Sequence, residues 1–296
     1  MNHSQLRAFH AVAEAEGFTR AAAALRVSQP TLSGQVKALE AAYGVRLFER
    51  RGRRVWPTEL GHALLEVTRR LFSLESEADQ MLSAARGLRR GHLRIGADAP
   101  YSLIRVVGAF ARRYPGLTLS LAVGNSDRLL QDLYDHRTDV AMLANLAADP
   151  RLHAIRFRDD RLVVFVDRRH SWAGRRRVRL AELGGQRVIL REVGSTTRRI
   201  LETALARAGV ALADMMEIGS REAVREAVAA GLGVGVVART EFGRDDRLHA
   251  LEVQDADLAS TEYVVCLAER RDLRIVRAFF DLLAQRTPPG RRTRSD

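Results

Sequence analysis

Residues 18–40 read FTRAAAALRVSQPTLSGQVKALE, a pattern that predicts two short helices joined by a tight turn. Alanine, the strongest helix former, fills most of the first helix. Ser28 can cap the second helix, and Pro30 suits that helix's first turn. One apolar stripe then follows the second helix at positions i, i+4 and i+7, formed by Leu32, Val36 and Leu39.

The opposite face of the second helix is polar, and none of its side chains is acidic. These short side chains can hydrogen-bond to base edges or to phosphates: Gln29, Thr31, Ser33, Gln35 and Lys37. The pattern is typical of a helix-turn-helix whose second helix enters the major groove of DNA. An ordinary pair of core helices with a polar outer face is the alternative. The short polar side chains favour the DNA-binding interpretation.

Charge is concentrated in the same region. The 296-residue chain has a formal net charge of +12 and an isoelectric point near 11, which indicates polyanionic partners. Between Arg20 and Thr58, eight basic residues accompany two acidic ones, a local excess of +6. Lys37 is the only lysine, so a GC-rich genome is an alternative source of part of the arginine bias.

The single cysteine and the hydropathy pattern exclude other classes. Cys266 is alone, so the chain can form neither an intrachain disulfide nor a cysteine metal cluster. It lies in an apolar run, where an inert core thiol is favoured over a redox sensor. No stretch approaches the ~20 apolar residues of a membrane span, and the N-terminus has no signal-peptide pattern. We therefore expect a cytoplasmic protein without a membrane partner.

Flanking segments complete a small DNA-binding domain. Residues 4–15 predict a first helix that packs behind the helix-turn-helix, with Gly17 ending it. Residues 46–56 predict a hairpin around Arg51 and Gly52, a wing whose arginines can follow the phosphate backbone or enter a minor groove. A merely solvated basic loop is the alternative.

A long helix is expected after the wing, from the cap at Thr58 to about Leu88. Apolar residues recur along it at spacings of three and four: Leu60, Leu64, Val67, Leu71, Leu74 and Ala78. A helix roughly 45 Å long cannot bury such a stripe on a three-helix domain. We therefore expect it to pair with its own copy in a dimer.

From His92 onward, predicted strands and helices alternate, which is typical of a parallel sheet covered by helices. The alternation occurs in two similar cycles, and each cycle is too short for the whole region. We therefore expect two α/β lobes with a cleft between them. The last residues, rich in proline and arginine, are expected to be disordered.

Several spaced motifs make the chain resemble a LysR-type transcriptional regulator over nearly its full length. The DNA-binding motifs are residues 6–9, 18–22, 28–33, 35–37, 39–40, 44–50 and 57–61. Weaker matches follow at residues 139–141, 194–198 and 230–234. Gly34 is a departure, because many relatives carry a longer polar side chain there.

The resemblance implies an N-terminal all-α winged helix-turn-helix and a C-terminal α/β two-lobed domain of periplasmic-binding-protein type, joined by a long linker helix. The expected limits are 1–58 for DNA binding, 59–89 for the linker, 90–287 for effector binding and 288–296 for a disordered basic tail. Lobe I takes about 90–164 and 267–287, and lobe II about 165–266. The resemblance also implies a bacterial homotetramer that binds double-stranded promoter DNA as an activator or a repressor, with RNA polymerase as a further candidate partner.

The candidate DNA contacts lie on the two helices and the wing. Glutamine and serine can read base edges, proline and threonine can contact a thymine methyl, and lysine or arginine can bind phosphate. The full set is Arg20, Ser28, Gln29, Pro30, Thr31, Ser33, Gln35, Lys37, Arg50, Arg53 and Arg54.

Three strand-to-helix junctions are the candidate effector site, because helix N-termini present free amide groups and a partial positive charge. The residues are Asp98, Ala99, Pro100, Tyr101, Ser102, Asn125, Ser126, Gly194, Ser195, Thr196 and Thr197. The third junction has the strongest anion-site character, which favours a small anionic effector such as a carboxylate, sulfate or phosphonate. Simple helix capping is the alternative. Asp98 points instead to an amino group, and an amino-bearing acid would satisfy both.

Two other classes of function fit the sequence less well. An enzyme needs a nucleophile with a base or clustered metal ligands, and neither pattern occurs, so no catalytic residue, metal site or cofactor is predicted. The glycines of residues 231–235 precede a strand rather than a helix, which is poor evidence for a dinucleotide site. A sequence-independent architectural DNA binder would explain the charge but would leave the two-lobed domain without a purpose.

Overall fold

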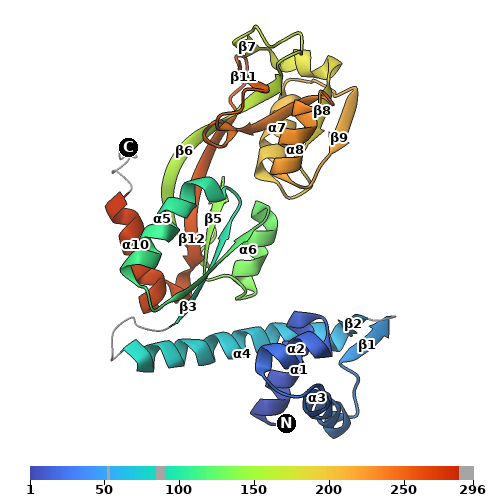
Figure 1. The fold of residues 1–296 in the computed structure, drawn as a ribbon, viewed down its shortest axis with the longest axis vertical. Coiled ribbons are helices and arrows are strands. Elements are labelled where there is room, and N and C mark those ends of the chain that lie inside the picture. Colours follow the sequence, from blue (N-terminus) through green and yellow to red (C-terminus); the bar gives the residue numbers. More distant parts are fainter. Residues whose placement is uncertain (52–53, 85–90, 287–296) are drawn as a thin grey trace. The chain divides into compact units, whose positions relative to one another are not determined.

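The computed structural model describes residues 1–51, 54–84 and 91–286 (Figure 1). The chain forms two compact units, one made mainly of Met1–Leu82 and the other of most of the remaining residues. The predicted fold class is confirmed: the first unit is a winged helix-turn-helix, and the second is an α/β domain of two lobes. The expected disordered tail lies outside the described residues.

Three helices and a hairpin build the first unit. They are α1 (His3–Ala15), α2 (Phe18–Leu25), α3 (Gln29–Tyr43), β1 (Phe48–Arg51) and β2 (Arg54–Pro57). The predicted stripe of α3 is buried, since Leu32, Val36 and Leu39 are at most 2% exposed. They pack with Phe9 and Val12 of α1, which are fully buried. The helix-turn-helix prediction is therefore correct down to the inward face of its second helix.

Polar contacts hold the wing against α3. The Glu40 carboxylate accepts hydrogen bonds from the backbone N–H groups of Leu47 and Phe48, at 2.7 and 3.3 Å. Thr58 caps the next helix by accepting a bond from the Gly61 N–H at 3.0 Å. A Cβ at Gly61 would lie 2.2 Å from the Leu47 carbonyl oxygen, so this close approach requires glycine.

The linker helix α4 (Glu59–Ala84) has two apolar faces. One face packs on α1: Leu65 is buried, and the Phe72 ring lies 4.9 Å from the His10 ring. The other face is open, with exposed fractions of 39–62% at Leu60, Val67, Leu71 and Leu74. The expected end near Leu88 lies outside the described residues. The 26 residues of α4 span about 39 Å, and the open stripe has heptad spacing.

A mixed sheet forms the first lobe, with helices on both faces (Figure 1). Its strands are, in spatial order, β4 (Thr118–Val123), β3 (His92–Ala97), β5 (Val140–Ala144), β12 (Ala259–Leu267) and the first half of β6 (Leu152–Asp167). The helices are α5 (Pro100–Arg113), α6 (Ser126–Tyr134), α10 (Arg274–Arg286) and the 3₁₀ turn η2 (Ala268–Arg270).

The second half of β6 starts the sheet of the second lobe. On one side it pairs with β10 (Val234–Ala238), which is followed by β8 (Arg187–Leu190) and β9 (Asp214–Glu217). On its other side it pairs with β11 (Leu248–Val253), which in turn pairs with β7 (Arg177–Val178). The helices are α7 (Thr196–Arg207), α8 (Arg221–Ala229), α9 (Arg239–Phe242) and the 3₁₀ turn η1 (Leu180–Gly185).

Strand direction differs in part from the predicted parallel sheet. Within each lobe the βαβ strands are parallel, β3 with β4 and β5, and β8 with β9 and β10. However, β6 and β12 pair antiparallel with each other, and each runs against its neighbours. They do so because they carry the chain out to the second lobe and back, side by side (Figure 1).

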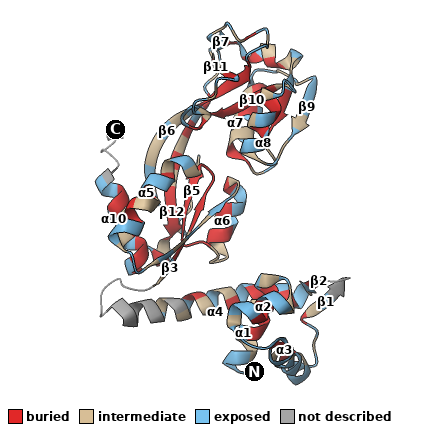
Figure 2. Cartoon of the chain, viewed as in Figure 1, coloured by how far each residue is buried: buried red, intermediate tan, exposed pale blue. Residues whose placement is uncertain are grey.

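The interior is apolar in both lobes, as the buried strands of Figure 2 show. Cys266 of β12 is fully buried, and burial raises the pKa of its thiol to about 12. A thiol with this pKa is unreactive at neutral pH, so the structure supports the inert core cysteine. None of the described helices is long and apolar enough to cross a membrane.

Candidate functional site

The first site is the exposed face of α3. Gln29, Pro30, Thr31 and Lys37 are exposed, whereas Ser33 and Gln35 are half-buried. This division follows from the inward stripe, because residues opposite to it on a helix must face outward. The face is therefore free to approach a ligand.

Local hydrogen bonds engage some of the polar side chains on the exposed face of α3. Ser28 is the N-cap of α3: its hydroxyl accepts from the Thr31 N–H at 3.2 Å and lies 2.7 Å from the Thr31 hydroxyl. Within the described part of the chain, no hydrogen bond engages the side chains of Gln29 and Lys37. Gln29 and Lys37 are thus the most available polar groups of the face.

The predicted arginine contacts are only partly described. Arg20 is exposed on α2, and its guanidinium donates to the Glu16 carbonyl oxygen at 3.2 Å. The backbone places Arg50 in β1 and Arg54 in β2, near the tip of the hairpin. The side chains of Arg50 and Arg54, and the whole of Arg53, lie outside the described residues.

The second site is built from the three predicted junctions, which meet where the two lobes touch. Asp98 and Ala99 link β3 to α5, Asn125 precedes α6, and Ser195 precedes α7. One small cavity of about 20 Å³ is lined by seven of the predicted residues: Asp98, Ala99, Asn125, Ser126, Ser195, Thr196 and Thr197.

The other four predicted residues do not line this cavity. Tyr101 lines an adjacent space of about 40 Å³. Gly194 has a positive φ of 92°, and a Cβ there would lie 3.1 Å from the Asn125 side-chain oxygen. Pro100 and Ser102 belong to the first turn of α5 and line neither space.

A chain of hydrogen bonds crosses between the lobes. The Thr196 hydroxyl donates to the Ser126 hydroxyl at 2.8 Å, and the Ser126 hydroxyl donates to Asp98 Oδ2 at 2.5 Å. Arg199 donates to the Thr196 hydroxyl at 2.8 Å, and the Ala144 N–H donates to Asp98 Oδ2 at 2.9 Å. The hydroxyls of Ser126 and Thr196 therefore hold the lobes together in this closed arrangement.

The N-terminus of α7 offers free donors. Within the described residues, the backbone N–H groups of Thr196, Thr197 and Arg198 have no hydrogen-bond acceptor, and the Ser195 side chain makes no cap bond. Arg191, at the end of β8, lines the same cavity and binds both carboxylate oxygens of Glu192, at 2.7 and 2.8 Å. These groups can accept an anion.

The same cavity is also lined by acidic side chains, of which the sequence pattern indicated only Asp98. Glu241 of α9 and Glu262 of β12 are 8% and 2% exposed and line the same cavity. Arg221 lies 3.2 Å from Glu241, and Arg158 lies 2.7 Å from Glu262. Burial raises the pKa of Asp98 and of Glu262, and it raises the pKa of Glu241 to about 7.

The missed residues had little signal in the sequence. Arg191 directly follows a predicted strand, so its position at a strand end was open to the same argument as the three junctions. Glu241 lies on a helix of four residues that no periodicity predicts, and Glu262 and Arg221 lie in otherwise ordinary elements. Across the residues that the structure describes, no group of three or more histidine, cysteine or acidic side chains could hold a metal ion.

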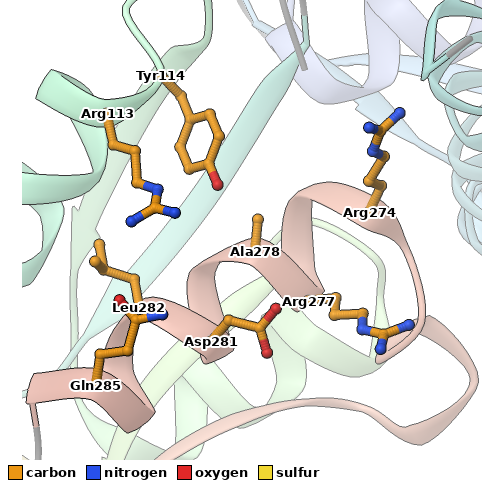
Figure 3. A pocket seen from close by; sticks show the side chains of 8 residues that line it. All are labelled: Arg113, Tyr114, Arg274, Arg277, Ala278, Asp281, Leu282 and Gln285. Carbon is orange, nitrogen blue, oxygen red and sulfur yellow. The ribbon is translucent and has the colours of Figure 1, made fainter. Parts of the chain in front are cut away.

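A larger and more open groove lies elsewhere in the first lobe, between the end of α5 and α10 (Figure 3). It measures about 530 Å³ and is lined by Arg113 and Tyr114 of α5 and by Arg274, Arg277 and Asp281 of α10, among others. It contains none of the predicted effector residues. Size alone therefore does not identify the predicted site.

Comparisons with known proteins agree with this division into two sites. Residues 3–62 match the family model described as "Bacterial regulatory helix-turn-helix protein, lysR family". Residues 86–288 match the model described as "LysR substrate binding domain". The chain is similar to the HTH-type transcriptional activator CmpR of Synechocystis, with 30% identity over 94% of this chain and 93% of the relative.

Two solved structures carry information on ligands. Full-length CbnR complexed with its target DNA is 25% identical, with a TM-score of 0.70 over 96% of this chain and 99% of that one. The regulatory domain of CcmR from Synechocystis, in complex with 2-PG, is 28% identical, with a TM-score of 0.61. That match covers 67% of this chain and 98% of the CcmR domain.

Proposed function

This chain belongs to the LysR family of DNA-binding transcriptional regulators, and we propose that α3 reads its promoter while a small acidic effector binds in the cleft between its lobes. The family membership confirms the predicted resemblance. The relatives are named as regulators of transcription, which also confirms the predicted regulator rather than an enzyme. CbnR, a LysR family transcriptional regulator, has been solved in complex with its target DNA, which supports DNA binding by this chain.

The observation that supports the DNA contacts is the exposed, acid-free face of α3. A glutamine such as Gln29 can bind an adenine edge in two places, which costs about 1–3 kcal/mol when it is lost. Lys37 can neutralise a phosphate, which adds affinity without sequence preference. The wing arginines Arg50, Arg53 and Arg54, together with Arg20, are proposed to bind the backbone beside the groove.

Salt-titrated DNA binding tests these roles. The DNA is the region upstream of the chain's own gene, with a scrambled copy as the comparison. We expect Gln29→Ala to reduce the preference for the true promoter, and Lys37→Ala to weaken binding to both DNAs and lower the salt slope by about 1. Arg112→Ala, which removes an exposed arginine from α5, is the control. Unchanged preference and unchanged slope in both variants would refute the assignment.

The effector proposal is supported by the free amides at the start of α7 and by Arg191 beside them. An anion at a helix N-terminus gains from the helix dipole and from unpaired N–H groups. The CcmR regulatory domain, solved with 2-PG, supports a small ligand for this domain type. The effector-binding residues proposed are those of the three junctions, with Arg191 added.

A thermal-shift screen with small acids, 2-PG included, tests the cleft. A ligand at 100 times its Kd adds about 2.7 kcal/mol of stability, which is readily measured. Arg191→Gln is expected to remove the shift, whereas Arg187→Gln, at the exposed start of the same strand, is expected to keep it. A shift that survives Arg191→Gln would place the ligand elsewhere.

We further propose the oligomer and the domain limits. The open stripe of α4 would be covered by the α4 helix of a second copy, and pairs of dimers would form the tetramer.

The ranges 1–58, 59–89 and 90–287 remain our proposed division, with the tail at 288–296 and RNA polymerase as a candidate partner. Residues 262–265 of β12 pair with β5 of the first lobe, so we place the return crossing between lobes at β12.

A further inference from the structure

Two buried carboxylate oxygens lack a partner, and both border the same cavity. Among the described residues, Asp98 Oδ1, Glu241 Oε1 and Glu262 Oε2 are the buried side-chain oxygens that have no hydrogen bond, and of these Glu262 Oε2 lies 2.7 Å from the Arg158 guanidinium. Asp98 is 7% exposed and Glu241 is 8% exposed. Buried polar groups are normally satisfied, so a pair of exceptions at one site indicates a missing partner.

Each carboxylate is held by its other oxygen. Asp98 Oδ2 accepts bonds from Ser126 and from the Ala144 N–H, at 2.5 and 2.9 Å. Glu241 Oε2 lies 3.2 Å from Arg221. The free oxygens are therefore fixed in place, which is how a binding site presents acceptors to a ligand.

The charges around the cavity call for a cationic donor. Three acidic side chains line it, Asp98, Glu241 and Glu262. Arg221 pairs with Glu241 and Arg158 pairs with Glu262, so among the described residues Asp98 has no arginine partner. Arg191, which also lines the cavity, is already bound by both oxygens of Glu192. Burial raises the pKa of both Asp98 and Glu241; the hydrogen bonds from Ser126 and the Ala144 N–H offset that rise only in part for Asp98, and the positive charge of Arg221 does so for Glu241.

Other groups that line the cavity have the opposite character. The first turn of α7 presents the free N–H groups of Thr196 and Thr197, and the guanidinium of Arg191 lines the same cavity. An acidic group suits these donors, and a protonated amine suits the two carboxylates. A ligand that carried only an acidic group would leave Asp98 Oδ1 and Glu241 Oε1 without a hydrogen bond.

We propose that the effector is a small amino acid or aminophosphonate, whose protonated amine binds Asp98 Oδ1 and Glu241 Oε1 while its acidic group binds the first turn of α7. This inference rests on the cleft being the effector site. The closed spaces of about 20 and 40 Å³ hold water molecules but no amino acid, so the lobes separate for binding. Such a separation breaks the hydrogen bond from Thr196 to Ser126 and two exposed hydrogen bonds between the lobes, Tyr101 with Glu222 and Arg199 with Asp127.

Matched ligands on one carbon skeleton test the amine. The full chain is titrated with triples such as aspartate, malate and succinate, or alanine, lactate and propionate, extended to the twenty amino acids and their deaminated acids. Aminomethylphosphonate is compared with methylphosphonate. We expect at least one amino compound to bind at least tenfold more tightly than its hydroxy and unsubstituted partners.

Two variants test the carboxylates. Asp98→Asn and Glu241→Gln are each expected to reduce the preference for the amine at least tenfold and to retain binding of the plain acid. Asp246→Asn, an exposed carboxylate of the same lobe as Glu241, is the control and should keep the preference.

The outcomes separate this inference from the proposed function. Plain or hydroxy acids that bind as tightly as the amines, in an Arg191-dependent way, overturn the amine proposal and leave the effector site standing. Amine preference that survives in both carboxylate variants also overturns it, as does a panel in which no amino compound binds. Thermal shifts produced equally by ammonium chloride would reduce the site to one for a simple cation and overturn it too.

Discussion

Glu241→Gln is expected to stabilise the C-terminal unit at alkaline pH and to change little at acidic pH. Burial raises the pKa of Glu241 from 4.5 to about 7, with the carboxylates of Asp98 and Glu262 adding to the rise and Arg221 and Arg158 opposing it. Below pH 4.5 the carboxyl is protonated in both the folded and the unfolded state, so it does not lower the free energy of unfolding. Between pH 4.5 and 7 only the unfolded state loses its proton, so stability falls as pH rises.

Above pH 7 the loss of stability no longer changes with pH, and its size follows from the pKa values of Glu241 in the folded and the unfolded state. A difference of roughly 2.5 pKa units corresponds to about 3 kcal/mol. Glutamine resembles the protonated carboxyl and cannot ionise, so the variant escapes this cost. The folded unit then gains on the order of 3 kcal/mol at pH 8 and almost nothing at pH 4.5.

Urea unfolding of the full chain between pH 4.5 and 8.5, followed by tryptophan fluorescence, measures the effect, because Trp172 lies buried in the second lobe. Glu202→Gln, at an exposed position of α7, is the control and should follow the parent chain at every pH. A Glu241→Gln variant that is no more stable than the parent at pH 8, or equally stabilised at pH 4.5, refutes the reasoning. Together with the amine test, the result would show a residue kept for binding at a cost in stability.

Three further predictions concern packing, assembly and reactivity. Gly61→Ala should destabilise the N-terminal unit by about 2 kcal/mol, because the new Cβ would lie only 2.2 Å from a backbone oxygen. Gly34→Ala, whose Cβ meets nothing within 4 Å, should stabilise α3 by up to ~1 kcal/mol in the same urea titration. Leu71→Glu should shift the dimer towards monomer in sedimentation velocity, whereas Arg70→Ala, off the stripe, should not; an unchanged dimer in both would exclude α4 as the interface. Cys266, with a pKa of about 12, should react with a thiol reagent at pH 8 only after unfolding, and rapid labelling of the native protein would contradict its burial.

The N-terminal unit was predictable because its determinants are local. The cap at Ser28, the proline after it and the stripe of Leu32, Val36 and Leu39 all lie within one helix and its first turn. Helical periodicity assigns each residue to the buried or the exposed face without knowledge of any distant residue. The same argument predicted the open stripe of α4.

The cleft was predictable only in outline. Strand-to-helix junctions are visible as short polar segments between periodic ones, and seven of the residues predicted there do line one cavity. The hydrogen bond from Thr196 to Ser126, which joins residues 70 positions apart, has no trace in either junction's own sequence. The antiparallel pairing of β6 with β12 was also missed, because the sequence of an apolar strand indicates neither the strand it pairs with nor the direction of the pairing.

By itself, the sequence determined the helix-turn-helix, the apolar stripe of the linker and the alternation of strands and helices, since each depends on residues within one turn or one strand. Only the tertiary structure decided which side chains from distant parts of the chain lie next to one another in the cleft. It set Glu241 from a four-residue helix beside Asp98 from the end of β3, in a distant part of the chain, and left one oxygen of each without a partner. The chemistry of the cleft therefore depends on the sheet pairing that brings the two lobes together, because no local pattern records which buried charges will meet.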